Sequence, residues 1–505
     1  MHADRSGASV LPRPAAAMAP RALRPAPRSA VPAAVMRPAS ALSAAQELAR
    51  RRLVRVVMAI YLLAIFEGSL RKYVLPEFGQ YIFFIRDPVL LYAYWIATRA
   101  GLWPRHSLPL KISLWLCAFG ALLLVLQSAF GAASDLRLLL GVYGWRAYFF
   151  YAPLAFLIGA QFRTTDLLRL ARITLWLSVP IAVLVAAQFF SPPGAAINVG
   201  VAEDAAMQFR DLTIDSAHIR PPGPFSSNVG QQQFVTTALA MLLALMLQPA
   251  NRRGVGLATL LPAAAATFSC IALGGSRGTL LQCAMIGLFA LSVGFLGRGS
   301  GLKLRAFAIP LALATTAVLL YPVVFPEGFA AFVQRWNVAA HDESAFEGGV
   351  FGRALFGFVD FLRLVDIVPP LGFGLGFGGN ASTILKASVD GVMPGQLAET
   401  DYARQMVDLG VVCGLAYIGL RVALVAWLGR QVLRATRRSA ATMPMLLFGY
   451  AGYVVLLGQI TGNGSINVYA WLFSGLCIAA TREALAGAQR RPAPVAARVQ
   501  ARGPR

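Results

Sequence analysis

Long apolar segments recur along nearly the whole chain, and each has about the length that a helix needs to cross a bilayer. About twelve such segments are present, at 53–70, 81–98, 108–127, 146–162, 170–190, 232–249, 255–274, 279–296, 305–324, 403–427, 443–461 and 466–482. Only one long interruption, 325–402, divides the second half of the chain. The pattern predicts an all-α polytopic integral membrane protein with about 12 transmembrane helices and one large late loop.

The composition favours a membrane protein over a large soluble one. The 505 residues are 57% hydrophobic and only 13% charged, whereas a soluble protein carries about 25% charged residues. No Cys and His spacing typical of a metal site is present, and the five cysteines all fall inside predicted spans, at Cys117, Cys270, Cys283, Cys413 and Cys477. We therefore predict a protein with no metal and no cofactor.

The distribution of positive charge indicates which partners the protein has. The chain carries 45 Lys and Arg residues against 22 Asp and Glu residues, a net charge of +23. Such an excess can signal nucleic acid binding, but the arginines crowd the two tails and the short connections, as they do in cytoplasmic loops. Basic connections are predicted at 99–107, 163–169, 251–254, 297–303 and 429–439. This placement argues against nucleic acid and favours contact with anionic membrane lipid.

Alternation of the spans gives a consistent topology with both termini in the cytoplasm. Residues 1–52 and 485–505 are expected as disordered basic tails, 53–324 as helices one to nine, and 403–484 as helices ten to twelve. The loop 325–402 would then lie on the outer side of the membrane. The other outer connections are predicted at 71–80, 131–145, 191–231, 275–278 and 462–465.

Arg277 is the first candidate for chemistry. It stands in a predicted outer connection of a few residues, between Gly275 and Gly278, where the following helix would direct its N-terminus at the same place. A charge so close to the hydrocarbon is costly unless it faces a cavity with an anionic partner. The alternative is an interfacial arginine that extends to the headgroups.

Arg220 is the second candidate, because the prolines that follow it fix the chain and would aim its guanidinium. A solvated loop arginine is an equally good interpretation of Arg220 alone. A binding role for Arg220 is favoured if it acts together with Arg277, because two guanidinium forks can hold a diphosphate.

The large loop offers further candidates. Arg353 follows Gly352, and a glycine-rich stretch at 370–379 predicts a tight turn where backbone approaches a substrate or another helix. Glu399 and Asp401 come directly before a long span, where a carboxylate can be a helix cap or a general base for a sugar hydroxyl.

Three charged residues fall near or within the first two spans. Glu67 and the adjacent pair Arg86 and Asp87 are functional candidates by default, because charges are costly in the membrane. An adjacent pair of opposite charges is more often a structural ion pair than a catalytic site.

In the order and placement of these motifs the chain resembles the O-antigen ligase and O-antigen polymerase superfamily of bacterial surface-glycan enzymes. The resemblance covers roughly 55–480. It rests on the turn at Ser276-Arg277-Gly278, the late loop with Gly352-Arg353 and Pro370 to Gly376, the motif Glu399-Thr400-Asp401-Tyr402, the following Asp408-Leu409-Gly410, and the upstream Arg220 to Phe225.

The resemblance implies an activity and roles for residues. Members of the family transfer a glycan from undecaprenyl diphosphate to a sugar hydroxyl on the outer face, with no nucleotide sugar and no catalytic metal. By similarity Arg277 and Arg220 would hold the donor diphosphate. In the transfer that this implies, Arg353 is the candidate for a third cation, and Glu399 or Asp401 is the candidate for the base. Many ligases have a histidine before the tyrosine, and the acidic motif of this chain favours a polymerase.

The expected function is therefore a glycosyltransferase that polymerises undecaprenyl-diphosphate-linked repeat units of an exopolysaccharide or O-antigen. Its expected partners are that lipid-linked glycan, membrane lipid and the machinery of polysaccharide export or chain-length control. The alternatives are an O-antigen ligase, a lipid-linked oligosaccharide transporter, and a non-catalytic scaffold. A transporter should have internal repeats and short outer loops.

Overall fold

The computed structural model describes residues 42–130, 137–200, 218–297, 300–344, 356–385, 387–389 and 391–490. The chain divides into two units, Met1–Pro38 and Ala39–Arg505, and all of the described residues belong to the second. Arg353 lies outside the described residues, so its predicted role stays a prediction.

Every regular element in these ranges is a helix, and strand pairing is limited to one isolated bridge between Val389 and Val392. The long helices are α1 (Ala44–Ser69), α3 (Arg86–Arg99), α4 (Leu108–Phe130), α5 (Arg137–Trp145), α6 (Ala152–Gln161), α7 (Thr164–Phe190), α9 (Asn228–Met246), α11 (Leu257–Gly274), α12 (Arg277–Leu296), α13 (Ser300–Val324), α14 (Pro326–Ser344), α18 (Asp401–Arg438), α19 (Met443–Leu457) and α20 (Gly464–Gln489). Short helices are η1 (Leu70–Val74), η2 (Pro76–Phe78), α2 (Gly79–Ile82), η3 (Arg146–Phe150), η4 (Ala196–Asn198), α10 (Ala250–Arg253), η5 (Asp360–Leu364), α16 (Asn380–Ile384) and α17 (Pro394–Leu397).

Nine of the described helices are long and apolar enough to cross a membrane, which identifies an all-α, multi-pass membrane protein. The other three predicted spans coincide with shorter helices. They are α3 with 14 residues, the π-helical η3 followed by the 10 residues of α6, and α19 with 15 residues. Three of the twelve predicted crossings therefore rest on helices that are shorter than a membrane span.

Three predicted boundaries are corrected by the structure. Helix α1 begins at Ala44, before the predicted tail boundary at 52, because Ser43 and Gln46 form a capping box at its N-terminus. Helix α20 continues to Gln489, past the predicted boundary at 484. The predicted outer connection 131–145 holds helix α5, whose glycines Gly141 and Gly144 let neighbouring chain approach closely.

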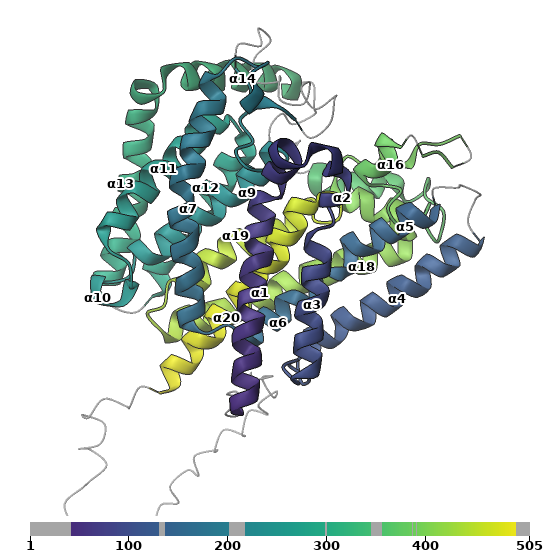
Figure 1. The fold of residues 1–505 in the computed structure, drawn as a ribbon, viewed down its shortest axis with the longest axis horizontal. Helices are drawn as coiled ribbons and strands as arrows, with labels where there is room; N and C mark the ends of the chain where they lie inside the picture. The colour runs from purple at the N-terminus through teal and green to yellow at the C-terminus, as the bar shows by residue number, and fades with distance from the viewer. Residues whose placement is uncertain are drawn as a thin grey trace, which may run out of the picture. The chain divides into compact units, whose positions relative to one another are not determined.

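Helix α20 is the central element, and it contacts α6, α19, α18, α9, α7 and α1. The most apolar 18-residue stretch of α20 is 83% buried inside the protein, whereas the corresponding stretch of α13 contains no buried residue. In Figure 1, α13 and α4 lie at the two margins of the view, with α1, α19 and α20 between them. The central helices thus provide the packed core, and the marginal helices expose apolar side chains such as Trp115 and Val318 to lipid.

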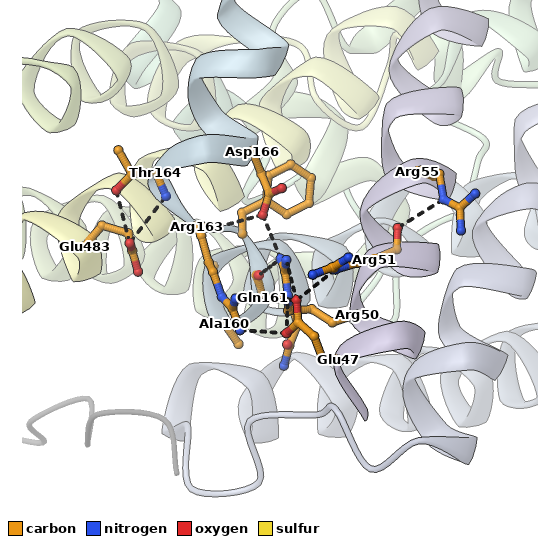
Figure 2. Close-up of polar contacts among 12 residues, drawn as sticks. Glu47, Arg50, Arg51, Arg55, Ala160, Gln161, Arg163, Thr164, Asp166 and Glu483 are labelled. Atoms are coloured by element: carbon orange, nitrogen blue, oxygen red, sulfur yellow. Dashed lines mark hydrogen bonds and ion pairs between the residues drawn. The ribbon is translucent and has the colours of Figure 1, made fainter. Parts of the chain in front are cut away.

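An ion-pair network connects three helix termini at one end of the helix bundle, and we call this end the Glu47 end. Arg50 of α1 bonds Glu47 at 3.1 Å and Asp166 of α7 at 2.7 Å, and Arg163 bonds Glu47 at 2.7 Å. Glu483 of α20 accepts from Thr164 at the start of α7. Figure 2 shows these side chains turned toward one another from α1, α7 and α20. The network fixes three helix ends that the sequence predicts on the cytoplasmic side.

The opposite end, which we call the Arg86 end, is connected by a continuous series of contacts. Glu67 near the C-terminus of α1 bonds Arg86 at the start of α3, and Arg86 lies beside Gly464 at the start of α20. The backbone of Gly68 abuts Phe225, whose ring packs on Gly230 at the start of α9. The C-terminus of α1 and the N-termini of α3, α9 and α20 therefore meet at one end, which the topology predicts to be outer.

The glycine-rich stretch packs into a break in α18. Gly410 interrupts the helix with a φ of 79°, and Gly372 in the loop has a φ of 75° and lies against its backbone. The carbonyls of Val407 and Asp408, which the break leaves unpaired, accept from the Phe373 amide at 2.8 Å and from Gln127 at 2.9 Å. The tight turn predicted at 370–379 is thus confirmed, and its glycines serve contacts between helices and loop.

Candidate functional site

Arg277 is the first residue of α12, where the sequence predicts it. Gly275 ends α11 in the left-handed region with a φ of 54°, and Ser276 caps α12 by accepting from the Thr279 amide at 3.4 Å. The guanidinium is half-buried and lies at the positive end of a helix of 20 residues. Gly278 is close to Gln232 of α9, so the turn belongs to the Arg86 end.

The loop that carries Arg220 is held rigidly by buried side chains. Gly223, with a φ of 61°, donates its amide to Gln188 at 2.7 Å, and its carbonyl accepts from Lys72 at 3.0 Å. Ser69 of α1 donates to the Pro224 carbonyl at 3.1 Å. The Nε atom of Arg220 is buried and has no hydrogen-bond partner. This segment is thus bonded to α1, η1 and α7, and it lies on the end of α1.

The two predicted carboxylates have different environments. Glu399 is exposed in the loop before α18. Asp401 is only 4% exposed, and its carboxylate accepts from Arg421 at 2.5 Å, from the Thr461 hydroxyl at 2.8 Å and from Gln405 at 3.2 Å. A carboxylate with this many donors is already satisfied. The geometry gives Asp401 a structural task and leaves Glu399 as the accessible carboxylate of the pair.

Asp401 joins three elements at the Arg86 end. Thr400 is the N-cap of α18, and Asp401 itself holds the Thr461 turn before α20. Its partner Arg421 comes from the part of α18 beyond the break and donates to the carbonyls of Val455 and Gly458 at 2.9 and 3.0 Å. A cation on the last carbonyls of α19 is favourable because they carry the negative end of that helix.

A second group of charges surrounds Phe83, and we call Glu67, Arg71, Arg86, Asp87 and Arg146 the arginine cluster. Glu67 bonds Arg86 at 2.8 Å and Arg71 at 3.5 Å, and Asp87 accepts two bonds from Arg146. The guanidinium carbons of Arg146 and Arg71 lie 4.9 and 5.6 Å from the centre of the Phe83 ring. Such contacts hold cations against an aromatic face.

Arg404 lies next to this cluster, on the first turn of α18. It donates to the Gly378 carbonyl at 2.6 Å and pairs with Asp401 at 3.5 Å. Its guanidinium lies directly against Gly462, where a side chain would collide with it. The ring of Tyr143 stacks on Phe83, with the two ring centres 6.1 Å apart. The turn before α20, which contains Gly462, thus leaves space for the Arg404 guanidinium.

The sequence identified some of these residues and missed others. Glu67 and the Arg86–Asp87 pair were candidates, but Arg86 bonds Glu67, and Asp87 bonds Arg146 rather than its neighbour in sequence. Lys72, Arg404 and Arg421 were not singled out. A signal was present, since dibasic Arg71-Lys72 follows the first span on the side where positive charge is disfavoured. The pairing of residues on distant helices is not encoded in local spacing.

Among the described residues, no group of three or more His, Cys, Asp and Glu side chains could hold a metal ion. Comparison with models of known protein families and with curated protein sequences finds no match for this chain. The family resemblance therefore rests on the motifs alone, and the activity it implies is a proposal.

Proposed function

We propose that the protein is a membrane glycosyltransferase that polymerises undecaprenyl-diphosphate-linked oligosaccharide repeat units on the periplasmic face of the bacterial inner membrane. One observation supports this most directly. Arg277, Arg220 and Glu399 come from three separate segments, and each belongs to the Arg86 end of the bundle. Fixed cations and an accessible carboxylate on one side are the groups that an inverting transfer from a lipid diphosphate needs.

In the proposed reaction an acceptor hydroxyl attacks the anomeric carbon of the lipid-linked sugar. The new glycosidic bond forms as the bond from that carbon to the diphosphate oxygen breaks, and the hydroxyl proton passes to the Glu399 carboxylate. Arg277 and Arg220 stabilise the charge that develops on the leaving undecaprenyl diphosphate. Asp401 holds the surrounding helix ends and does not take the proton, because its oxygens already accept from Arg421, Thr461 and Gln405.

The test is the size of lipid-linked and exported glycan in the native host after deletion of the gene. The proposal expects single repeat units to accumulate on the lipid carrier while long polymer disappears. Long polymer that remains on its carrier and fails to reach its acceptor would indicate a ligase instead. Unchanged pools would contradict both, and the transporter would then be tested by the orientation of the donor across the membrane.

Variants in the complemented deletion strain locate the chemistry. Arg277→Ala and Glu399→Gln should each lower polymer formation by about 100-fold, the usual effect of losing one charge-stabilising group or one general base. The matched control is Glu77→Gln, which neutralises an exposed carboxylate in η2 at the same end. Normal polymer length with both Arg277→Ala and Arg277→Lys would exclude the assignment of Arg277.

A further inference from the structure

Helix α14 changes the direction of the chain at the end of α13. Only Phe325 separates the two helices, and Pro326 is the first residue of α14, a position that suits proline. Figure 1 shows α14 lying across the upper end of α13 instead of continuing along it. The sequence predicts this stretch as part of the large loop 325–402, yet the structure starts it with a helix of 19 residues.

The depth of α14 is fixed by Tyr321 of α13. The Tyr321 hydroxyl lies within hydrogen-bond distance of the Ala272 carbonyl in α11 and of the Gly328 carbonyl in α14, at 2.6 and 3.1 Å. Ala272 belongs to the last turn of α11, which is long and apolar enough to cross a membrane. The first turn of α14 therefore lies at the level where a membrane span ends.

One face of α14 is apolar and exposed. Phe329, Val333 and Trp336 are 37%, 38% and 46% exposed, and their spacing along the helix places them on the same side. Glu327 lies roughly half a turn away from Trp336 around the helix, and it pairs with His218 at 3.4 Å. Helix α14 is therefore amphipathic, and its apolar face needs a partner that excludes water.

The apolar face of α14 continues a surface that already faces lipid. The most apolar stretch of α13 contains no buried residue, and Val324 at the end of α13 is exposed. Aromatic rings extend this surface from α13 onto α14, with neighbouring ring centres 5.3, 6.2 and 5.8 Å apart, through Phe329, Tyr321, Phe332 and Trp336 in that order. Tyr and Trp are enriched where the hydrocarbon meets the headgroups. This continuity favours the bilayer over another protein as the partner.

We propose that α14 is an interfacial helix that inserts Phe329, Val333 and Trp336 into the lipid leaflet at the Arg86 end. Such a helix lies in the plane of the interface, with its apolar face about 5–10 Å into the boundary between headgroups and acyl chains. Helix α14 contains one arginine and no lysine, so apolar contact rather than attraction to anionic headgroups holds it there. This membrane contact does not depend on sugar transfer.

The test uses the full-length protein in phosphatidylcholine vesicles, with an environment-sensitive fluorophore coupled to Val333→Cys. A nitroxide carried by the lipid near its headgroup should quench this label about two-fold more strongly than the same label on Glu327→Cys. Glu327→Cys is the matched control, because the Glu327 side chain is 59% exposed on the same helix and lies away from the apolar face. The parent protein, labelled in parallel, gives the background from its five native cysteines.

The other possible partners and depths give different results. Equal quenching at the two positions would overturn the proposal. A label on Val333→Cys that fluoresces as in an apolar environment, but that lipid does not quench, would mean that a second copy or another protein covers the face. Stronger quenching by a nitroxide near the end of the acyl chain would show that α14 crosses the membrane, and quenching only with added phosphatidylglycerol would show that charge holds it. Each of these results would also contradict the interfacial placement.

Discussion

At the scale of single residues, Asp401 links both parts of α18 to the turn before α20 at the Arg86 end. It compensates the buried charge of Arg421 and anchors the Thr461 turn. Removing one partner of a buried ion pair leaves the other charge without compensation, which costs about 3–5 kcal/mol.

Asp401→Asn is therefore expected to lower the free energy of unfolding by about 3 kcal/mol, because Arg421 would stay buried at the end of α19 without its counter-ion. Thermal unfolding of the purified protein in detergent measures this effect. Glu399→Gln is the control, and it should unfold like the parent because Glu399 is exposed. Equal stability of the parent and the Asp401→Asn variant would show that Asp401 does not hold the helix ends.

Gly462 is the second residue at which the structure predicts the effect of a substitution. A methyl group at this position would occupy the place of the Arg404 guanidinium, so Gly462→Ala should displace that cation from its bonds to Gly378 and Asp401. We expect loss of polymer formation in the complemented strain with the protein still inserted in the membrane. Gly487→Ala is the matched control, because nothing lies within 4 Å of the methyl group that it adds. Full activity of Gly462→Ala would mean that the position of Arg404 does not matter for transfer.

At the scale of elements, the sequence predicts single helices well and their breaks poorly. The spans appear where the apolar segments are, since an unpaired backbone group in lipid is so costly that each segment becomes a helix. Gly410 lies inside the predicted span 403–427, yet it breaks α18 because its φ of 79° ends the helical path. That conformation depends on loop residues such as Gly372 and on Gln127 of α4, which are distant in sequence.

The same reasoning explains which parts of the candidate site could be predicted from the sequence. The placement of Arg277 at a helix N-terminus follows from the apolar segment after it, and the fixed loop at Arg220 follows from its prolines. The burial of Asp401 could not be predicted, because its donors Arg421 and Thr461 lie on other segments. Arg71 and Arg86 are likewise brought together by Glu67 through packing of α1 on α3.

The break in α18 gives a prediction for the element as a whole. Gly410→Ala should destabilise the protein by about 1–3 kcal/mol, because a residue with a side chain is strained at this φ and the methyl group would meet the Pro370 carbonyl. Gly419→Ala lies in the same helix with nothing within 4 Å of its added methyl group, and it should stabilise by about 0.5–1 kcal/mol. Chemical unfolding of the two variants compares them, and an unaffected Gly410→Ala protein would argue against the break.

At the scale of the whole molecule, the two ends of the bundle should face different compartments. The basic connections predict that the Glu47 end is cytoplasmic and the Arg86 end is outer. Tyr81→Cys places a thiol at the Arg86 end, where Tyr81 is 75% exposed, and a membrane-impermeant maleimide should label it in cells with a permeable outer membrane. Arg51→Cys, at the Glu47 end, should be labelled only after lysis.

The parent protein is the control for this labelling, because its five native cysteines are free. The expected result is a label on Tyr81→Cys above the parent level and none on Arg51→Cys in unlysed cells. The reverse pattern would place the arginine cluster and Glu399 in the cytoplasm, and the proposed transfer on the periplasmic face would then be wrong.

The shortness of α3 and α19 has a consequence for the membrane around the protein. Both helices run from the Glu47 end to the Arg86 end with only 14 and 15 residues, a rise of about 21 and 22 Å. The hydrocarbon of a bilayer is about 30 Å thick. Neither helix alone therefore spans the hydrocarbon, and the bilayer beside α3 and α19 is expected to be thinner than the bilayer beside the longer helices. Thicker bilayers should increase this mismatch and so lower the stability of the inserted protein.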